Sequence, residues 1–192
     1  MSVYNSSMNP IFSADIAALP ARDRILATAH RLFYQEGLRA TGIDRLIAES
    51  GVTKVTFYRH FPSKNDLIQA YLAQRHSLWM DWFRGALARQ PGPAALVDAL
   101  REWFSSDDFR GCAFINGAGE MPAEPAVMDA ARRHKAEMRQ AIAERLPESP
   151  GKNEMAEMLS LAVDGAIVRA QLDGHPDAAL AALESLIGKL AG

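Results

Sequence analysis

Apolar side chains recur at helical spacing along most of the chain, and this pattern begins at Ala21. Polar residues separate a first set of apolar positions three or four apart, which predicts an amphipathic helix through Ile25, Ala29, Leu32 and Phe33. Gly37 lies where a helix often ends in a left-handed residue. Residues 1–20 lack this spacing and end in Pro20, so we expect a flexible arm there.

Two short helices are predicted next, separated by a tight turn. The first begins at Thr41, where Thr41 and Asp44 have the spacing of a capping box, and it stops at Gly51. Thr53 is a suitable N-cap for the second, which covers residues 54–61 and ends before a proline. The pair has the form of a helix-turn-helix.

Longer helices fill the rest of the chain. Ser63 and Asp66 form another capping box, which opens a helix that continues to about Arg89. The expected segments beyond a Pro-Gly-Pro break are a helix carrying Leu96, Leu100, Trp103 and Phe104, a glycine-containing apolar stretch over 109–121, and helices over 125–146, 153–173 and 177–190. No segment alternates with period two, so the predicted fold class is all-α.

The last two predicted helices carry faces suited to packing against another helix. In the first, one face is shared by Met155, Met158, Leu159, Ala162, Ala166 and Ala170. This face narrows to alanine toward its C-terminal end, so another helix can approach closely. In the second, apolar residues repeat at three and four positions: Leu180, Leu183, Ile187 and Leu190.

Composition narrows the functional classes. The net charge is −2, but residues 1–75 hold nine basic and six acidic side chains while the remainder holds twelve and seventeen. The basic N-terminal part suits a DNA-binding module, because attraction to phosphates must be local. One cysteine and the absence of a signal or membrane-spanning stretch predict a cytoplasmic protein with no membrane partner.

The second short helix carries the predicted DNA contacts. In a helix-turn-helix, the N-terminal residues of the second helix face base edges, so we assign Lys54 and Thr56 to bases and Val55 to a thymine methyl group. Arg59 suits bases or phosphates. The remaining candidates are expected at phosphates or at the helix N-termini that present backbone N–H groups: Thr41, Thr53, Tyr58, His60 and Lys64.

The run GIDRLIAESGVTKVTFYRHFPSKNDL, preceded by ILATAHRLFYQEGLRATG, resembles the DNA-binding domain of the TetR/AcrR family of regulators over about residues 21–70. The residues that carry the resemblance are Phe33, Gly37, Thr41, Ile43, Ile47, Ala48, Gly51, Val52, Tyr58, Phe61, Lys64 and Leu67. It implies an all-helical homodimer, usually a repressor, that leaves DNA when a small molecule enters the C-terminal domain. Val55 departs from the family, where a small residue is more frequent, and this changes the expected base preference.

The predicted organisation is therefore an arm over 1–20, a three-helix DNA-binding domain over 21–66, and an effector-binding and dimerisation domain over 67–192. The similarity of two C-terminal segments to one branch of the family supports a dimer built from residues 153–190. Apolar and aromatic residues with a few polar ones among them are candidates for the effector pocket: Trp103, Phe104, Cys112, Phe114, Asn116 and Met158. Such residues are more often plain core, and Cys112 is either a redox switch or an inert small hydrophobe.

Two other classes fit less well. For an enzyme, Ser149 and Lys152 have Ser-x-x-Lys spacing but lie in a proline-glycine loop, Gly117-Ala-Gly119 lacks a preceding strand, and the dispersed histidines predict no metal site, cofactor or catalytic residue. A helical adaptor that binds only protein would explain the apolar helix faces over 153–190. It would not explain the basic helix after Thr53. A regulator with two recognition helices about 34–36 Å apart, matching a pseudo-palindromic operator, accounts for both features.

Overall fold

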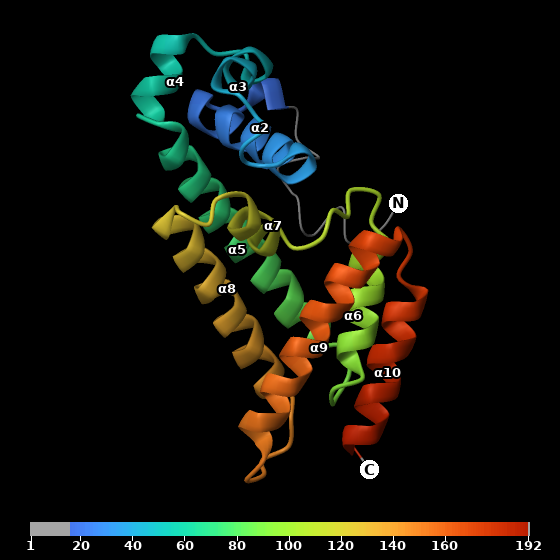
Figure 1. Ribbon diagram of the computed structural model, residues 1–192. Helices are drawn as coiled ribbons and strands as arrows, with labels where there is room; N and C mark the ends of the chain where they lie inside the picture. Colours follow the sequence, from blue (N-terminus) through green and yellow to red (C-terminus); the bar gives the residue numbers. More distant parts are fainter. Residues whose placement is uncertain (1–15, 192) are drawn as a thin grey trace. The chain divides into compact units, whose positions relative to one another are not determined.

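The computed structural model describes residues 16–191, where all regular structure is helical (Figure 1). This confirms the predicted all-α class. In chain order the elements are η1 (Ile16–Ala18), α2 (Ala21–Glu36), α3 (Ile43–Ser50), α4 (Lys54–His60), α5 (Lys64–Leu87), α6 (Ala95–Phe104), α7 (Ala113–Glu120), α8 (Pro125–Ala143), α9 (Lys152–Asp173) and α10 (Asp177–Ala191). Most of the predicted arm lies outside the described residues. None of these helices is both long and apolar enough to span a bilayer.

The described residues form two compact units that do not follow the order of the chain. The first, here called the N-terminal unit, combines the described residues up to Leu78 with Ala113–Arg132. The second, the C-terminal unit, combines Trp79–Cys112 with the described residues from Arg133 onward. The helices α5 and α8 therefore contribute residues to both units.

In the N-terminal unit, α2 packs against α3 and α4. The α2 residues predicted to face the core are buried, and so are Leu46 on α3 and Phe57 on α4, which are both 0% exposed. Phe61 follows α4 and is also buried, with its ring 6.4 Å from that of Phe57. The apolar positions of the two short helices thus hold these helices against α2.

Two of the predicted caps are present. The Thr53 side chain accepts a hydrogen bond from the Thr56 backbone N–H at 3.2 Å and caps α4. The Ser63 hydroxyl accepts from the Asp66 N–H at 3.1 Å at the start of α5. Both helices begin where the sequence predicts, because a short polar side chain satisfies an N–H group of the first turn.

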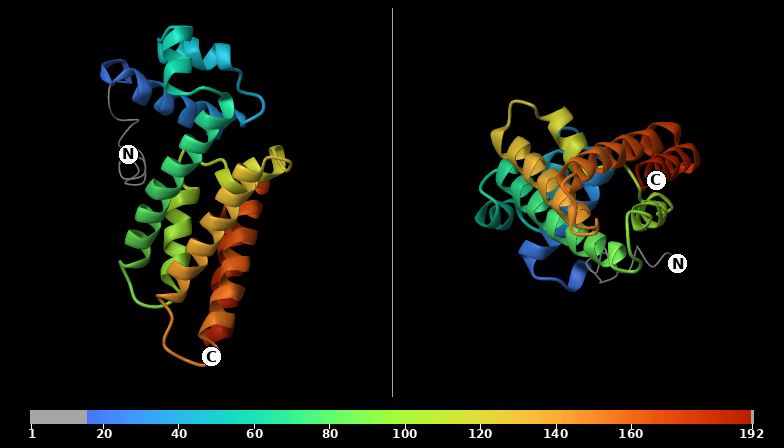
Figure 2. Two further views of the ribbon diagram at one scale, coloured as in Figure 1. Left: turned by 90° about the vertical axis from the view of Figure 1, so that its left-hand side faces the viewer. Right: turned by 90° about the horizontal axis from the view of Figure 1, so that it is seen from below.

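In the C-terminal unit, a cluster of aromatic rings joins α5, α6 and α8. The Trp79 ring stacks on Phe83 at 4.6 Å and meets Trp103 at 5.4 Å and His134 at 4.9 Å. Helices α9 and α10 lie side by side and also pack against α6 (Figures 1 and 2). Apolar residues of α10 that the sequence assigns to a helix seam are buried within this unit: Leu180, Leu183 and Ile187.

A buried histidine in the N-terminal unit predicts a pH-dependent stability. His30 is 1% exposed, its ring meets Tyr71 at 5.1 Å, and burial together with the Arg75 charge holds its pKa well below the ordinary value of 6.5. The unfolded chain therefore binds a proton near pH 6.5 that the folded chain does not bind. We therefore expect the free energy of unfolding to decrease by about 1.4 kcal/mol per pH unit as the pH falls below about 6.5, because of His30.

Urea unfolding at pH 7.5 and pH 5.5 measures this effect, with His30→Leu as the comparison because leucine does not titrate. The wild type should lose more stability between the two pH values than the variant. Equal losses would show that His30 binds a proton as readily in the folded protein as in the unfolded chain, and that its pKa is not lowered.

Candidate nucleic-acid interface

Helix α4 presents most of the predicted base-reading residues to solvent. Lys54 and Arg59 are exposed, and Val55 is 79% exposed, unusually high for an apolar residue. Tyr58 is 37% exposed, and its ring meets Phe57 edge-on at 5.4 Å. An exposed aliphatic residue between basic ones, on a short helix held by its buried face, is suited to the major groove, where it can contact a thymine methyl group.

The first turn of α4 is fixed by two threonines. The hydroxyls of Thr53 and Thr56 lie 2.9 Å apart, in addition to the cap between Thr53 and the Thr56 N–H. Thr56 is half-buried, as is His60 at the other end of the helix. The Thr56 hydroxyl therefore has one partner within the protein already, and a base contact would use its remaining hydrogen-bonding capacity.

The predicted capping role of Thr41 is wrong. Helix α3 begins at Ile43 with Gly42 as its N-cap, and no side chain caps it. Thr41 is 0% exposed, and its hydroxyl donates to the carbonyl of Gly37 at 2.8 Å. The Thr-x-x-Asp spacing predicted a cap at the start of α3. The threonine is instead buried, and its hydroxyl is used by a carbonyl group just after α2. Its side chain is thus turned away from any DNA-facing surface.

Lys64 lies at the start of α5 and is half-buried. Its ammonium donates to the Arg39 carbonyl at 3.4 Å, and burial lowers its pKa while the Glu120 carboxylate opposes that effect. A phosphate contact from Lys64 would therefore replace or share the contact with Arg39.

Glu120, at the end of α7, holds the turn between α2 and α3. The Arg39 backbone N–H donates to the Glu120 carboxylate at 2.8 Å, and the Arg39 guanidinium donates to the Glu120 carbonyl at 3.3 Å. This carboxylate also lies against Gly37, where a Cβ atom would stand 2.8 Å from it. Gly37 has a φ of 97°, so this position favours glycine for its backbone as well. No local pattern in the sequence predicts this contact, because the two partners are 81 residues apart.

Charge is distributed unevenly over the N-terminal unit. The segment from Gly51 to Asn65 has no acidic residue. Arg45 on α3 is held by Glu36 and Glu49, and these two hydrogen bonds raise its pKa. Glu49 also binds Arg31, and the two arginines lower its pKa. The cations of α4 are thus exposed, whereas Arg45 is committed to neighbouring carboxylates.

The predicted pocket residues are distributed over both units. Trp103 and Phe104 adjoin on α6, with ring centroids 5.8 Å apart, and Met158 on α9 is 38% exposed. Phe114 and Asn116 belong to α7 in the N-terminal unit, where the Phe114 ring meets His76 at 6.3 Å.

Cys112 is buried beside the ammonium of Lys135 in the C-terminal unit. Lys135 donates to the Asp164 carboxylate at 2.5 Å. Burial alone would lower the pKa of Lys135, but the Cys112 sulfur and the Asp164 carboxylate outweigh it and raise that pKa. The thiol thus has a polar neighbour that the sequence did not reveal.

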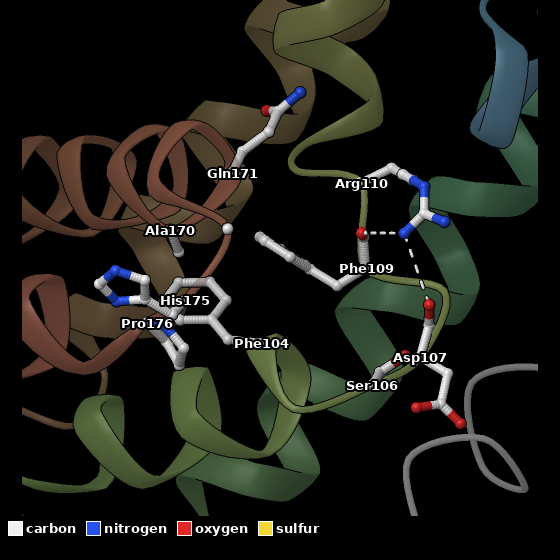
Figure 3. Close-up of a pocket in the computed structure, with 10 residues that line it drawn as sticks. Phe104, Ser106, Asp107, Phe109, Arg110, Ala170, Gln171, His175 and Pro176 are labelled. Atoms are coloured by element: carbon white, nitrogen blue, oxygen red, sulfur yellow. Dashed lines mark hydrogen bonds between the residues drawn. The ribbon is translucent and has the colours of Figure 1, made fainter.

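Two of the cavities lined by described residues lie in the C-terminal unit. The larger, of about 340 Å³, lies between the loop after α6 and the turn from α9 to α10, and Phe104 contributes to its wall (Figure 3). The smaller, of about 260 Å³, is lined mainly by apolar side chains, among them Met155, Leu159 and Ile187. Both volumes are close to the lower end of those of small-molecule sites.

The family model of the tetR family of bacterial regulatory proteins matches residues 25–71, which contain α3, α4 and most of α2. An uncharacterised HTH-type transcriptional regulator from Lactococcus lactis is 27% identical over 108 residues, and the match covers 53% of this chain and 55% of that protein. The chain thus matches about half the length of this curated relative.

Solved structures extend the similarity to nearly the whole chain. A TetR-family transcriptional regulator from Streptomyces coelicolor is 32% identical, with a TM-score of 0.77 over 90% of this chain and 96% of that one. CifR, a TetR family regulator solved as a cysteine mutant in complex with 26-bp double-strand operator DNA, has the same fold, with 24% identity and a TM-score of 0.73 over 88% of this chain and 96% of that one. These relatives are transcriptional regulators and not enzymes, in agreement with the prediction from the sequence. The chain belongs to the TetR family of bacterial regulatory proteins.

Proposed function

We propose that this protein is a ligand-responsive transcriptional repressor that binds a pseudo-palindromic operator as a homodimer. The observation that carries the proposal is the exposed, basic helix α4, which is capped by Thr53 and held against α2 by Phe57. Residues 21–66 bind DNA, and residues 67–192 bind the effector and form the dimer. The described complex of CifR with operator DNA supports this reading, because the fold is shared.

Helix α9 supplies the main dimer contacts. One outer side of this helix is apolar from its middle to its C-terminal end, with residues spaced three and four apart, all exposed except the half-buried Val168: Met158, Leu161, Gly165, Val168 and Leu172. Leu161 is 65% exposed and Leu172 is 75% exposed, although large apolar side chains are normally covered when they form a continuous stripe. This stripe lies opposite the side of α9 that contains Leu159 and Val163, which are buried in the same subunit.

Helix α10 adds a second surface to the dimer. Its exposed side carries small residues at the same three and four spacing: Ala178, Ala181, Ser185 and Gly188. Small side chains let a neighbouring helix approach closely. The dimer therefore uses the outer sides of α9 and α10, while Leu180 and Leu183 pack within the subunit.

The contact of Glu120 with the turn after α2 couples the effector to DNA binding. Helix α7 follows directly on the loop that lines the larger cavity, and its last residue holds Arg39 and lies against Gly37. A ligand that fits one arrangement of this loop better than another changes the position of the turn from which α3 and α4 extend. This differential affinity supplies the free energy for release from DNA.

Fluorescence anisotropy of a labelled intergenic fragment flanking the protein's own gene tests the function, with a scrambled fragment as control and salt varied from 50 to 300 mM. We expect two subunits per site, stronger binding to the intergenic fragment than to the control, and an affinity for either DNA that falls steeply with salt as counterions are released. Binding that is equal for the two fragments, followed by a failure to select any specific fragment from the genome, would refute the proposal.

A further inference from the structure

The larger cavity is built from two segments of the C-terminal unit that are far apart in the sequence. The C-terminal end of α6 and the loop over 106–110 form one side, and the end of α9 with the turn to α10 forms the other. The volume of about 340 Å³ is sufficient for a molecule of one or two rings. Of the six residues that the sequence assigns to an effector pocket, Phe104 is the one found in this wall.

One part of the wall is apolar and aromatic. The rings of Phe104 and Phe109 lie 4.9 Å apart at an angle of 52°, and Ala170 and Pro176 complete this part (Figure 3). Two rings in a tilted arrangement offer both an edge and a face to a third aromatic ring. The wall therefore favours a flat aromatic ligand over an aliphatic chain.

The polar part of the wall is suited to a hydroxyl group. Ser106, Gln171 and His175 line the cavity, and each of these side chains can both donate and accept a hydrogen bond. A phenolic hydroxyl has the same dual character, whereas a carboxylate only accepts and an ammonium only donates.

The charges of the wall select neither an anion nor a cation. Arg110 and Asp107 contribute one charge of each sign. The Arg110 guanidinium folds back on its own loop, where it donates to the carbonyls of Phe109 at 2.7 Å and Asp107 at 3.4 Å (Figure 3). A charged ligand of either sign would meet one charge of its own sign as well as one of the opposite sign, so the wall gives a neutral ligand no such penalty.

A buried donor lies directly behind the aromatic wall. Trp103 is 2% exposed, and its ring meets that of Phe109 edge-on at 5.3 Å. Its indole N–H has no hydrogen-bond acceptor among the described residues. The Trp103 ring thus supports Phe109, one of the two rings of the wall, from a buried position.

The rim of the cavity is joined to the segment that leads into α7. Gly111 has a φ of 77°, and a Cβ atom there would stand 1.9 Å from the amide oxygen of Gln171. The Gln171 side chain thus lies against the backbone of Gly111, two residues before α7 begins at Ala113. A ligand that binds Gln171 consequently acts on the start of the helix that ends at Glu120.

We propose that this cavity is the effector site and that it takes a small, neutral aromatic compound with a hydroxyl group, of the phenol class. The proposal rests on the ligand-responsive function proposed above and names the ligand chemistry and the place where it acts.

Isothermal titration calorimetry with 2-naphthol tests the site on the full-length protein, and saturation-transfer NMR with naphthalene tests the part played by the hydroxyl. Ala170→Phe fills the cavity from a buried position of its wall, and Gln171→Leu removes an amide while keeping a similar size. Met155→Trp fills the smaller cavity and is the matched control. Circular dichroism melting of each variant verifies that it folds.

We expect 2-naphthol to bind the wild type and Met155→Trp equally, and to bind Ala170→Phe at least tenfold more weakly. Gln171→Leu should weaken 2-naphthol about fivefold and leave naphthalene unchanged, because only the hydroxyl loses a partner. No binding to the wild type at 1 mM, or binding that Met155→Trp removes and Ala170→Phe does not, would overturn the proposal.

DNA binding separates this proposal from the function on which it rests. Operator affinity measured without ligand tests the regulator, whereas calorimetry without DNA tests the cavity. The protein could bind 2-naphthol with the expected sensitivity to Ala170→Phe and yet never bind a specific DNA fragment. That result would support the effector site and refute the proposed function as a regulator. A protein that binds its operator but keeps full 2-naphthol affinity in Ala170→Phe refutes the site alone.

Discussion

Leu161→Glu is expected to convert the homodimer into monomers and to lower operator affinity about 100-fold, because two linked recognition helices bind far more tightly than one. Leu161 lies in the middle of the apolar stripe on α9 and is 65% exposed in the single subunit. In a dimer through this stripe, the leucine would be buried against the partner, a gain of about 1.5–3 kcal/mol per subunit. Glutamate replaces that gain with the cost of burying an unpaired carboxylate in each subunit.

Light scattering after size-exclusion chromatography measures the halved molecular mass, and anisotropy measures the affinity. Ala136→Glu adds the same charge at an exposed position of α8 and should change neither result. The fold itself should survive in Leu161→Glu, because this side chain does not belong to the core of the subunit. A Leu161→Glu protein that remains dimeric with full affinity would place the interface elsewhere.

Lys54→Ala is expected to weaken operator binding at least about 30-fold, because the dimer loses one base contact in each subunit, and to weaken binding to scrambled DNA much less. Lys54 is exposed in the first turn of α4, where residues of a recognition helix reach base edges, and one good base contact is worth about 1–3 kcal/mol of discrimination. Loss of a base contact lowers the ratio of specific to non-specific affinity. Loss of a phosphate contact would instead weaken both by the same factor.

Arg45→Ala is the matched control, since it also removes one positive charge from the same domain. Its guanidinium is held by Glu36 and Glu49, so we expect both affinities to stay within about twofold of the wild type. Anisotropy titrations of both variants on both fragments measure these changes. Equal losses for Lys54→Ala and Arg45→Ala would mean that the ion pairs on α3 do not keep Arg45 from DNA, and the assignment of Lys54 to bases would fail.

The helical order of the described residues could be predicted from the sequence alone. Helix periodicity and local caps depend on residues three or four positions apart, and both kinds of signal were present around Thr53 and Ser63. The starts of α4 and α5 agree with the prediction for that reason. The same local reasoning failed at Thr41, because this side chain is buried and its hydroxyl donates to the carbonyl of Gly37, the residue that follows α2.

The candidate sites show where local reasoning ends. Exposure of Val55 and Tyr58 follows from the burial of Phe57 on α4 and of Phe61 directly after it, so the sequence could indicate the outer face of α4. The pocket residues could not be predicted in the same way. Aromatic residues at helical spacing become either core or cavity wall. Trp103 is a core residue, whereas the adjacent Phe104 lines the larger cavity.

The sequence by itself determined the helical class, the helix-turn-helix and its family resemblance, because these depend on residue spacing and local hydrogen bonds. Only the tertiary structure decided which apolar faces are covered within the subunit, as for Leu183, and which are left exposed, as for Leu161. It also brought Glu120 to Arg39 and Gln171 to Gly111. The physical reason is that burial and long-range contacts depend on how whole helices pack, and helical periodicity shows only which side of a helix is apolar and not which neighbour will cover it.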